Sequence, residues 1–106
     1  MSVRSLLALI PAAFALAAPL SAHASLDLAK KNACMACHAV DKKLVGPSYL
    51  EVAKKYADQK DAVEALAASI KKGGSGKWGP VPMPAQAALS DADAKTLAAW
   101  VLGGGK

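Results

Sequence analysis

The chain has 106 residues, which limits it to one small domain. It carries a formal net charge of +5, from 13 basic residues against 8 acidic ones, and every basic residue except Arg4 is a lysine. A nucleic-acid-binding protein of this charge would be expected to use arginine, whose planar guanidinium binds phosphate and guanine through paired hydrogen bonds, so we expect no nucleic-acid partner.

Residues 1–24 have the pattern of a cleaved signal peptide. Arg4 supplies a positive charge, residues 6–20 are almost wholly apolar, and small residues stand at the two positions before Ser25 that signal peptidase reads. The alternative is an uncleaved membrane anchor, but a spanning helix needs about 20 apolar residues, and this run is shorter and contains two prolines. We therefore expect cleavage after Ala24, a periplasmic location and no membrane attachment afterwards.

Cleavage would leave residues 25–106 as the mature domain, with 12 lysines against 8 acidic residues and a net charge of +4. A domain of this size buries barely enough apolar surface to offset its chain entropy. Much of its apolar content is alanine, which buries little area per residue. We therefore expect another component to fill the core, and we expect the chain not to fold without it.

Four helical segments, with no strand-like alternation, predict an all-α fold. The first runs from about Asp27, which is placed to cap it, towards Cys37. The second follows Pro47, where Ser48 and Glu51 form a capping box.

The third and fourth segments are amphipathic. The third opens with a second capping box, Asp61 and Glu64, and ends at Gly73, whereas the fourth opens at Ser90 with Asp93. Apolar residues recur at helical spacing in both segments: Val63, Leu66, Ala67 and Ile70 in the third, and Ala94, Leu97, Ala98 and Val101 in the fourth.

Residues 73–89, between these two helices, are rich in glycine and proline and long for so small a domain. A flexible linker is the simpler interpretation. However, Trp78, Val81 and Met83 would be costly to leave in water, and a proline stands on each side of Met83. We expect a rigid loop that holds another group in place.

Residues 34–38 read Cys-Met-Ala-Cys-His, the C-x-x-C-H spacing of covalent haem attachment. In this arrangement the thiols of Cys34 and Cys37 add to the two vinyl groups of one haem, and His38 lies under the iron. A disulfide or thioredoxin-like redox pair would normally sit within a βαβ pattern, which the sequence lacks. A zinc site would need four protein ligands, or three and a water.

The sixth iron ligand follows by elimination. His38 is the only histidine of the mature chain, and Met35 lies inside the attachment loop, so it cannot reach the opposite haem face. Met83 remains, and His/Met is a known haem ligation. With both axial positions filled, no site stays open for oxygen, peroxide or substrate, which predicts an electron carrier and not an enzyme. The alternative is a haem enzyme or gas-sensing cytochrome with an open distal site.

From Cys34 onward the chain resembles the short bacterial class I cytochromes c of the cytochrome c-551/c-552 type, in the segments CMACH, VGPSY, SIKKGG, WGPVPMP and AAW. The resemblance implies the small class I cytochrome c fold, with about four helices around one covalently bound haem c. It also implies the following site: covalent attachment at Cys34 and Cys37, axial ligands His38 and Met83, a hydrogen bond from His38 Nδ1 to the Pro47 carbonyl, and a hydrogen bond from the Trp78 indole to a haem propionate.

The chain departs from this pattern at Ala29, where many relatives have an aromatic residue, at Ala33, where they have glycine, and at Ser69, where some have a basic residue near a propionate. Trp100 is expected to pack between the first and last helices. The implied function is a periplasmic electron shuttle between respiratory membrane complexes and terminal reductases or oxidases such as nitrite reductase. We expect a monomer that docks transiently on its redox partners at the haem edge.

Overall fold

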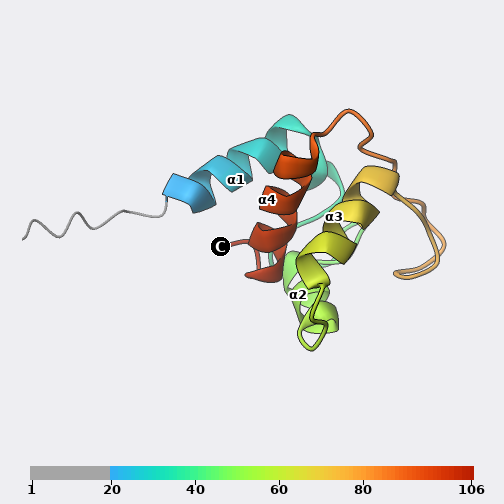
Figure 1. Ribbon diagram of the computed structural model, residues 1–106. Helices are drawn as coiled ribbons and strands as arrows, with labels where there is room; N and C mark the ends of the chain where they lie inside the picture. Colours follow the sequence, from blue (N-terminus) through green and yellow to red (C-terminus); the bar gives the residue numbers. More distant parts are fainter. Residues whose placement is uncertain (1–19) are drawn as a thin grey trace, which may run out of the picture.

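The computed structural model describes residues 20–106. This part of the chain forms four α-helices and one short 3₁₀ helix: α1 (Leu20–Lys31), η1 (Cys34–Ala36), α2 (Tyr49–Tyr56), α3 (Ala62–Lys72) and α4 (Asp91–Leu102) (Figure 1). Outside the helices, strand-type pairing in residues 20–106 is limited to two isolated bridges. The all-α prediction is therefore confirmed.

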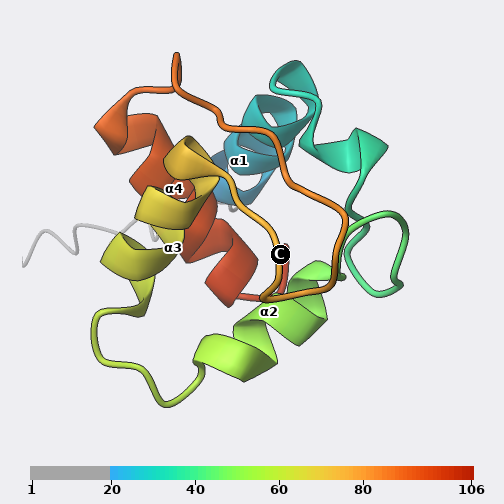
Figure 2. The same ribbon diagram turned by 90° about the vertical axis from the view of Figure 1, so that its right-hand side faces the viewer.

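Helix α4 lies at the centre of the fold and contacts α1, α2 and α3 (Figures 1 and 2). The apolar stripes predicted for the third and fourth helices meet there, because the following residues are buried: Leu66, Ala67 and Ile70 of α3, and Ala94, Leu97, Ala98 and Val101 of α4. Val63 is only partly buried. The 3.6-residue periodicity thus identified the packing faces of both helices.

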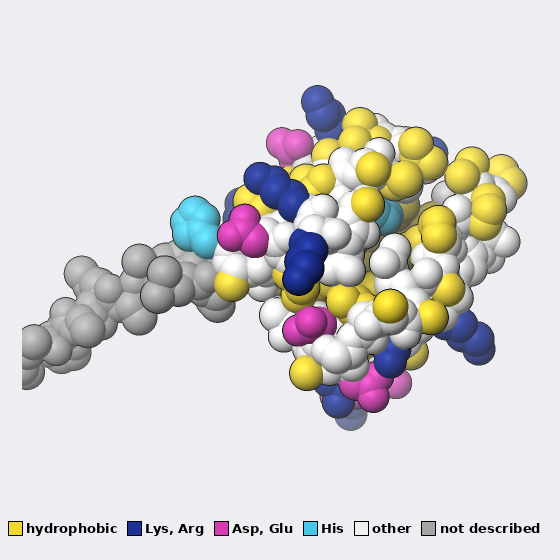
Figure 3. All heavy atoms as spheres, turned by 90° about the horizontal axis from the view of Figure 1, so that it is seen from above, with side chains coloured by type: hydrophobic (Ala, Val, Ile, Leu, Met, Phe, Trp, Pro, Cys, Tyr) yellow, Lys and Arg dark blue, Asp and Glu magenta, His cyan; other side chains and the backbone are white. Residues whose placement is uncertain are grey.

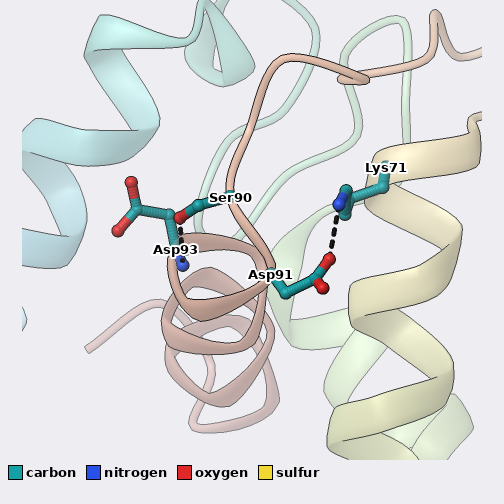
Figure 4. A network of polar contacts seen from close by, with 4 residues as sticks. All are labelled: Lys71, Ser90, Asp91 and Asp93. Carbon is teal, nitrogen blue, oxygen red and sulfur yellow. Dashed lines mark hydrogen bonds and ion pairs between the residues drawn. The ribbon is translucent and has the colours of Figure 1, made fainter.

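Two of the three predicted caps for the later helices are formed. The hydroxyl of Ser48 accepts a hydrogen bond from a backbone N–H of α2 at 3.1 Å, and that of Ser90 accepts one from α4 at 3.0 Å (Figure 4). The prediction for Asp61 is wrong, since its carboxylate accepts a hydrogen bond from Gln59 at 3.0 Å and caps no backbone group. Its backbone (φ −99°, ψ 29°) is not extended as that of a capping residue normally is.

An exposed ion pair joins α3 to the first turn of α4. Figure 4 shows the Lys71 ammonium reaching the Asp91 carboxylate. The hydrogen bond and the positive charge of Lys71 lower the pKa of Asp91 below its ordinary value. A carboxylate in a first helical turn also interacts favourably with the helix dipole, so this pair and the Ser90 cap both mark where α4 begins.

The first helix differs from its prediction at both ends. The described part of the helix already includes Leu20, so Asp27 lies inside α1 and does not cap it, and the helix stops at Lys31 before reaching Cys37. The helix cannot continue because Ala33 has left-handed backbone angles (φ 59°, ψ 20°), after which η1 begins. Of the predicted signal peptide, residues 1–19 lie outside the described part of the chain. Within residues 20–106, no helix is long and apolar enough to cross a membrane.

The segment 73–89 reaches out from α3 and doubles back towards α4 (Figure 1). The backbones of Gly74 and Met83 pair across it, with N–H···O distances of 2.8 and 3.1 Å. Near its end, the N–H of Gln86 donates to the carbonyl of Ile70 in α3 at 3.2 Å. The loop is therefore held to itself and to α3 by backbone hydrogen bonds.

Candidate functional site

A largely apolar cavity of about 370 Å³ lies among α2, α3, α4, the segment after η1 and the loop 73–89. Figure 2 looks onto these elements, with the loop passing in front of the helices. The cavity falls within the range of about 300–1,000 Å³ that is usual for small-molecule sites. All six predicted site residues line it: Cys34, Cys37, His38, Pro47, Trp78 and Met83.

The imidazole of His38 is oriented by a backbone carbonyl. Its Nδ1 lies 2.7 Å from the carbonyl oxygen of Pro47, the contact that the sequence resemblance implied. A carbonyl oxygen only accepts hydrogen bonds, so Nδ1 must be the donor, and in the neutral imidazole Nε2 is then the unprotonated ring nitrogen. This is the tautomer in which Nε2 can bind a metal.

Gly46 is a site residue that the sequence analysis missed. A Cβ atom there would lie 2.5 Å from Cε1 and 2.8 Å from Nδ1 of His38, so any side chain would displace the imidazole. The N–H of Gly46 also donates to the carbonyl of Cys37 at 2.7 Å. The ring of Tyr49 stacks against His38, with centroids 5.5 Å apart and planes at 25°. The position of the His38 ring is therefore restricted by the Gly46 backbone as well as by Tyr49.

The two cysteines are free thiols, not joined by a disulfide. Burial raises the pKa of the Cys34 thiol above its ordinary value. The neighbouring Tyr49 hydroxyl donates to the sulfur of Met35 at 3.4 Å, and burial, with a smaller effect from Cys34, raises the pKa of Tyr49 as well. The Cys34 thiol and the Tyr49 hydroxyl are therefore neutral at neutral pH. Because neither Cys34 nor Cys37 is in a disulfide, both thiols are available for covalent attachment.

Gly73 determines how closely the loop approaches the end of α3. Its φ is +67°, and a Cβ atom there would lie 2.5 Å from the backbone oxygen of Met83 and 2.7 Å from the nitrogen of Ala85. Only glycine combines this backbone conformation with so close a contact. The placement of Met83 at the cavity therefore depends on Gly73, whereas the sequence pattern indicates only that a helix ends there.

The two tryptophans occupy different surroundings. Trp78 is 36% exposed on the loop, and the ammonium of Lys55 lies 4.5 Å from its ring centroid. Trp100 is buried on α4, but its ring lies against Tyr49 of α2, with centroids 5.1 Å apart, an aromatic contact that the sequence did not indicate. Trp100 lines the cavity too, and so does Ala29.

Large hydrophobic side chains are exposed around the cavity rim. Val45 and Val81 both line the cavity and are 56% and 59% exposed, and Leu44, next to Val45, is 43% exposed. In the space-filling view of Figure 3, hydrophobic side chains gather on the side away from the grey segment, with lysines projecting at the edges. Such a concentration of exposed apolar side chains is a common property of contact surfaces.

The comparisons with known proteins agree with the geometry. The Cytochrome c family model matches residues 26–104. The chain is 61% identical over 79 residues to cytochrome c-552 of Hydrogenobacter thermophilus, covering 74% of this chain and 80% of that protein. It is 57% identical over 76 residues to cytochrome c-551 of Azotobacter vinelandii, covering 72% and 92%. The crystal structure of wild-type Nitrosomonas europaea cytochrome c552 matches with a TM-score of 0.71 and 56% identity, covering 74% of this chain and 96% of that one.

These relatives are small electron carriers and not enzymes. The features of this chain fit the same cofactor, because two free thiols at C-x-x-C-H spacing and an oriented imidazole line one apolar cavity. The chain therefore belongs to the cytochrome c family, as a class I cytochrome c of the c-551/c-552 type that carries electrons on one covalently bound haem c.

Proposed function

We propose that four residues hold the haem: Cys34 and Cys37 through thioether bonds, and His38 and Met83 as the two axial iron ligands. The observation that carries this proposal is that all four line one cavity, although Met83 comes from a loop far along the chain from the other three. The only other methionine of residues 25–106 is Met35, which lies within the attachment motif.

The surrounding contacts support this ligand set. Pro47 would keep Nε2 of His38 available to the iron and make it more basic by accepting the hydrogen bond from Nδ1. The backbone pair with Gly74 would hold Met83 in one position. Trp78 also lines the cavity, and we propose that its indole N–H donates to a haem propionate, since an indole can only donate.

When bound with one histidine and one thioether ligand, haem supplies a one-electron redox couple at a raised potential. The chain's own contribution is to keep both ligands in place in both oxidation states, because fixed ligands lower the reorganisation that accompanies electron transfer. A haem enzyme or gas sensor would instead need one axial position open. Met83 lines the same cavity as His38, which favours the closed site.

Met83→Ala tests the ligand set. The variant should lose the charge-transfer band that methionine ligation gives the ferric protein, bind carbon monoxide when reduced, and have a lower reduction potential. Met35→Ala is the matched control, because Met35 lies in the attachment segment and contacts Tyr49 of α2, so its loss should leave all three properties unchanged. Retention of the band in the Met83 variant would contradict the assignment.

We also propose that the mature protein is residues 25–106, a periplasmic monomer produced by cleavage after Ala24. The signal-like pattern of residues 1–24 supports this proposal, together with the position of covalent haem attachment outside the bacterial cytoplasm. Mass spectrometry of the purified haem protein would test it, because cleavage elsewhere would give a different N-terminal residue and mass.

In the periplasm, we propose, the protein shuttles electrons between an upstream cytochrome complex and a terminal reductase or oxidase such as nitrite reductase. Docking would use the rim patch of Leu44, Val45 and Val81, which is small and apolar, as suits a transient complex. The lysines, at a mature charge of +4, would add moderate electrostatic steering.

Val81→Asp distinguishes apolar docking from electrostatic docking. A charge placed in the rim patch should slow electron transfer to a purified acceptor more than Lys42→Ala does, because the patch sets the lifetime of the complex. The rate should also fall only modestly with added salt. A larger effect of Lys42→Ala, with a steep salt dependence, would mean that the lysines and not the rim patch control docking.

A further inference from the structure

The cavity wall carries positive charge and no negative charge. Among the described residues that line it are two lysines, Lys43 and Lys77, and no aspartate or glutamate. The rest of the wall is mainly apolar, and an apolar wall with only cations favours a ligand that is itself largely apolar and carries carboxylates. Haem has this composition, so its two propionates need partners at this wall.

Lys77 and Tyr56 meet on that wall. Tyr56, the last residue of α2, is only 3% exposed, and the ammonium of Lys77 lies 2.5 Å from its Oη and 4.4 Å from its ring centroid. An ammonium group can only donate hydrogen bonds, so Oη is the acceptor in this contact. The proton of the Tyr56 hydroxyl is left to be donated elsewhere, and within residues 20–106 no acceptor for it is found.

A second contact, made to the backbone of Lys77 and not to its ammonium, joins the same two segments. Lys55 precedes Tyr56 on α2, and its ammonium donates to the carbonyl oxygen of Lys77 at 3.3 Å while lying over the ring of Trp78. Adjacent residues of α2 thus hold adjacent residues of the loop. Lys77 lines the cavity, whereas Lys55 does not.

We propose that Lys77 and Tyr56 together bind one carboxylate of the haem. The ammonium and the hydroxyl would both donate to it, which gives two charge-assisted hydrogen bonds, one of them between opposite full charges. Ser69 lines the same cavity and cannot supply this charge, so the loop provides it through Lys77. The inference depends on the proposed function only in placing the haem in this cavity, and not on the identity of the sixth ligand.

This contact would affect the reduction potential in a predictable direction. A positive charge held beside the haem disfavours the ferric state, which carries one more positive charge than the ferrous state. It therefore raises the potential, and its removal should lower it. Loss of the Tyr56 hydroxyl should shift the potential in the same direction but less, because it removes a hydrogen bond without removing a full charge.

The test compares four variants of the full haem protein: Lys77→Met, Lys77→Arg, Tyr56→Phe and the matched control Lys55→Met. Two properties are measured, the reduction potential and the haem carboxylate stretching bands in the oxidised-minus-reduced infrared difference spectrum. We expect Lys77→Met to lower the potential and shift a carboxylate band, Tyr56→Phe to do the same to a smaller extent, and Lys77→Arg to preserve both properties. Lys55→Met should leave the band in place.

Equal potentials and an unshifted band in Lys77→Met and Lys55→Met would overturn the proposal. A general loosening of the loop would not reproduce the expected pattern, because it would shift both lysine variants alike. The carboxylate bands also test the proposal independently of whether Met83 is an axial ligand. If the methionine charge-transfer band were absent from the wild-type protein, the ligand set would be wrong, while the band shift in Lys77→Met would still support the carboxylate site.

Discussion

The helices and the two segments that bear the site residues are ordered by different means. Of the thirteen buried hydrophobic residues, all lie in the four α-helices except Leu89, which shortly precedes α4. In contrast, no residue within 34–47 or 73–88 is buried by other parts of the polypeptide. These two segments are held by backbone contacts, such as the pairs Gly74–Met83 and Gly46–Cys37.

The difference indicates what each region needs in order to keep its shape. Burial of apolar side chains orders the helices and is spread over many residues, so it tolerates small changes. The site segments depend on a few close backbone contacts and on the cofactor that they enclose. A single added methyl group, or the absence of haem, should therefore affect the site segments first.

The largest effect is expected from removing the haem. Cys34→Ala combined with Cys37→Ala should give a chain without protected amides in hydrogen exchange, because four of the thirteen buried hydrophobic residues are alanines and the haem would supply most of the remaining apolar surface. Native-like protection throughout α3 and α4 in this double variant would show that the helices are stable by themselves. The helices and the site segments would then be stabilised independently of each other.

Gly46→Ala should have the next largest effect. The new methyl group would collide with the His38 ring, so we expect a loss of about 1–3 kcal/mol in the free energy of unfolding and an altered visible spectrum of the haem. Gly103→Ala is the matched control, since a Cβ atom there meets nothing closer than 3.4 Å. If denaturant unfolding and spectra of the two variants were alike, the close approach of Gly46 to His38 would not matter.

Ala33→Gly should have a smaller effect of opposite sign. Ala33 is exposed and is the one non-glycine residue with positive φ in the described part of the chain. Glycine adopts this conformation without strain, so after allowing for its greater freedom when unfolded we expect a gain of about 0.5–1 kcal/mol. The same change at Ala57, where φ is −53°, should lower the stability. A stability loss in both variants would mean that Ala33 is not strained.

Several features of this protein could be predicted from sequence because their signals are local. The stripes of α3 and α4 appear as a 3.6-residue period, and the caps at Ser48 and Ser90 as hydroxyl residues just before an apolar run. The attachment motif 34–38 is recognised from spacing alone. The role of Met83 stays a prediction, made from the composition of residues 25–106, which leaves few alternative ligands.

Other features were decided only by the tertiary structure. The missing cap at Asp61 depends on its backbone angles and on a competing partner, Gln59, that spacing does not reveal. Gly46 and Gly73 are needed because other segments pass within 3 Å of where a side chain would stand, and the Lys77–Tyr56 contact joins residues 21 positions apart. A periodicity or a motif records how a residue relates to its neighbours in the chain. A close approach between distant segments leaves no such record, because it exists only once the chain has folded.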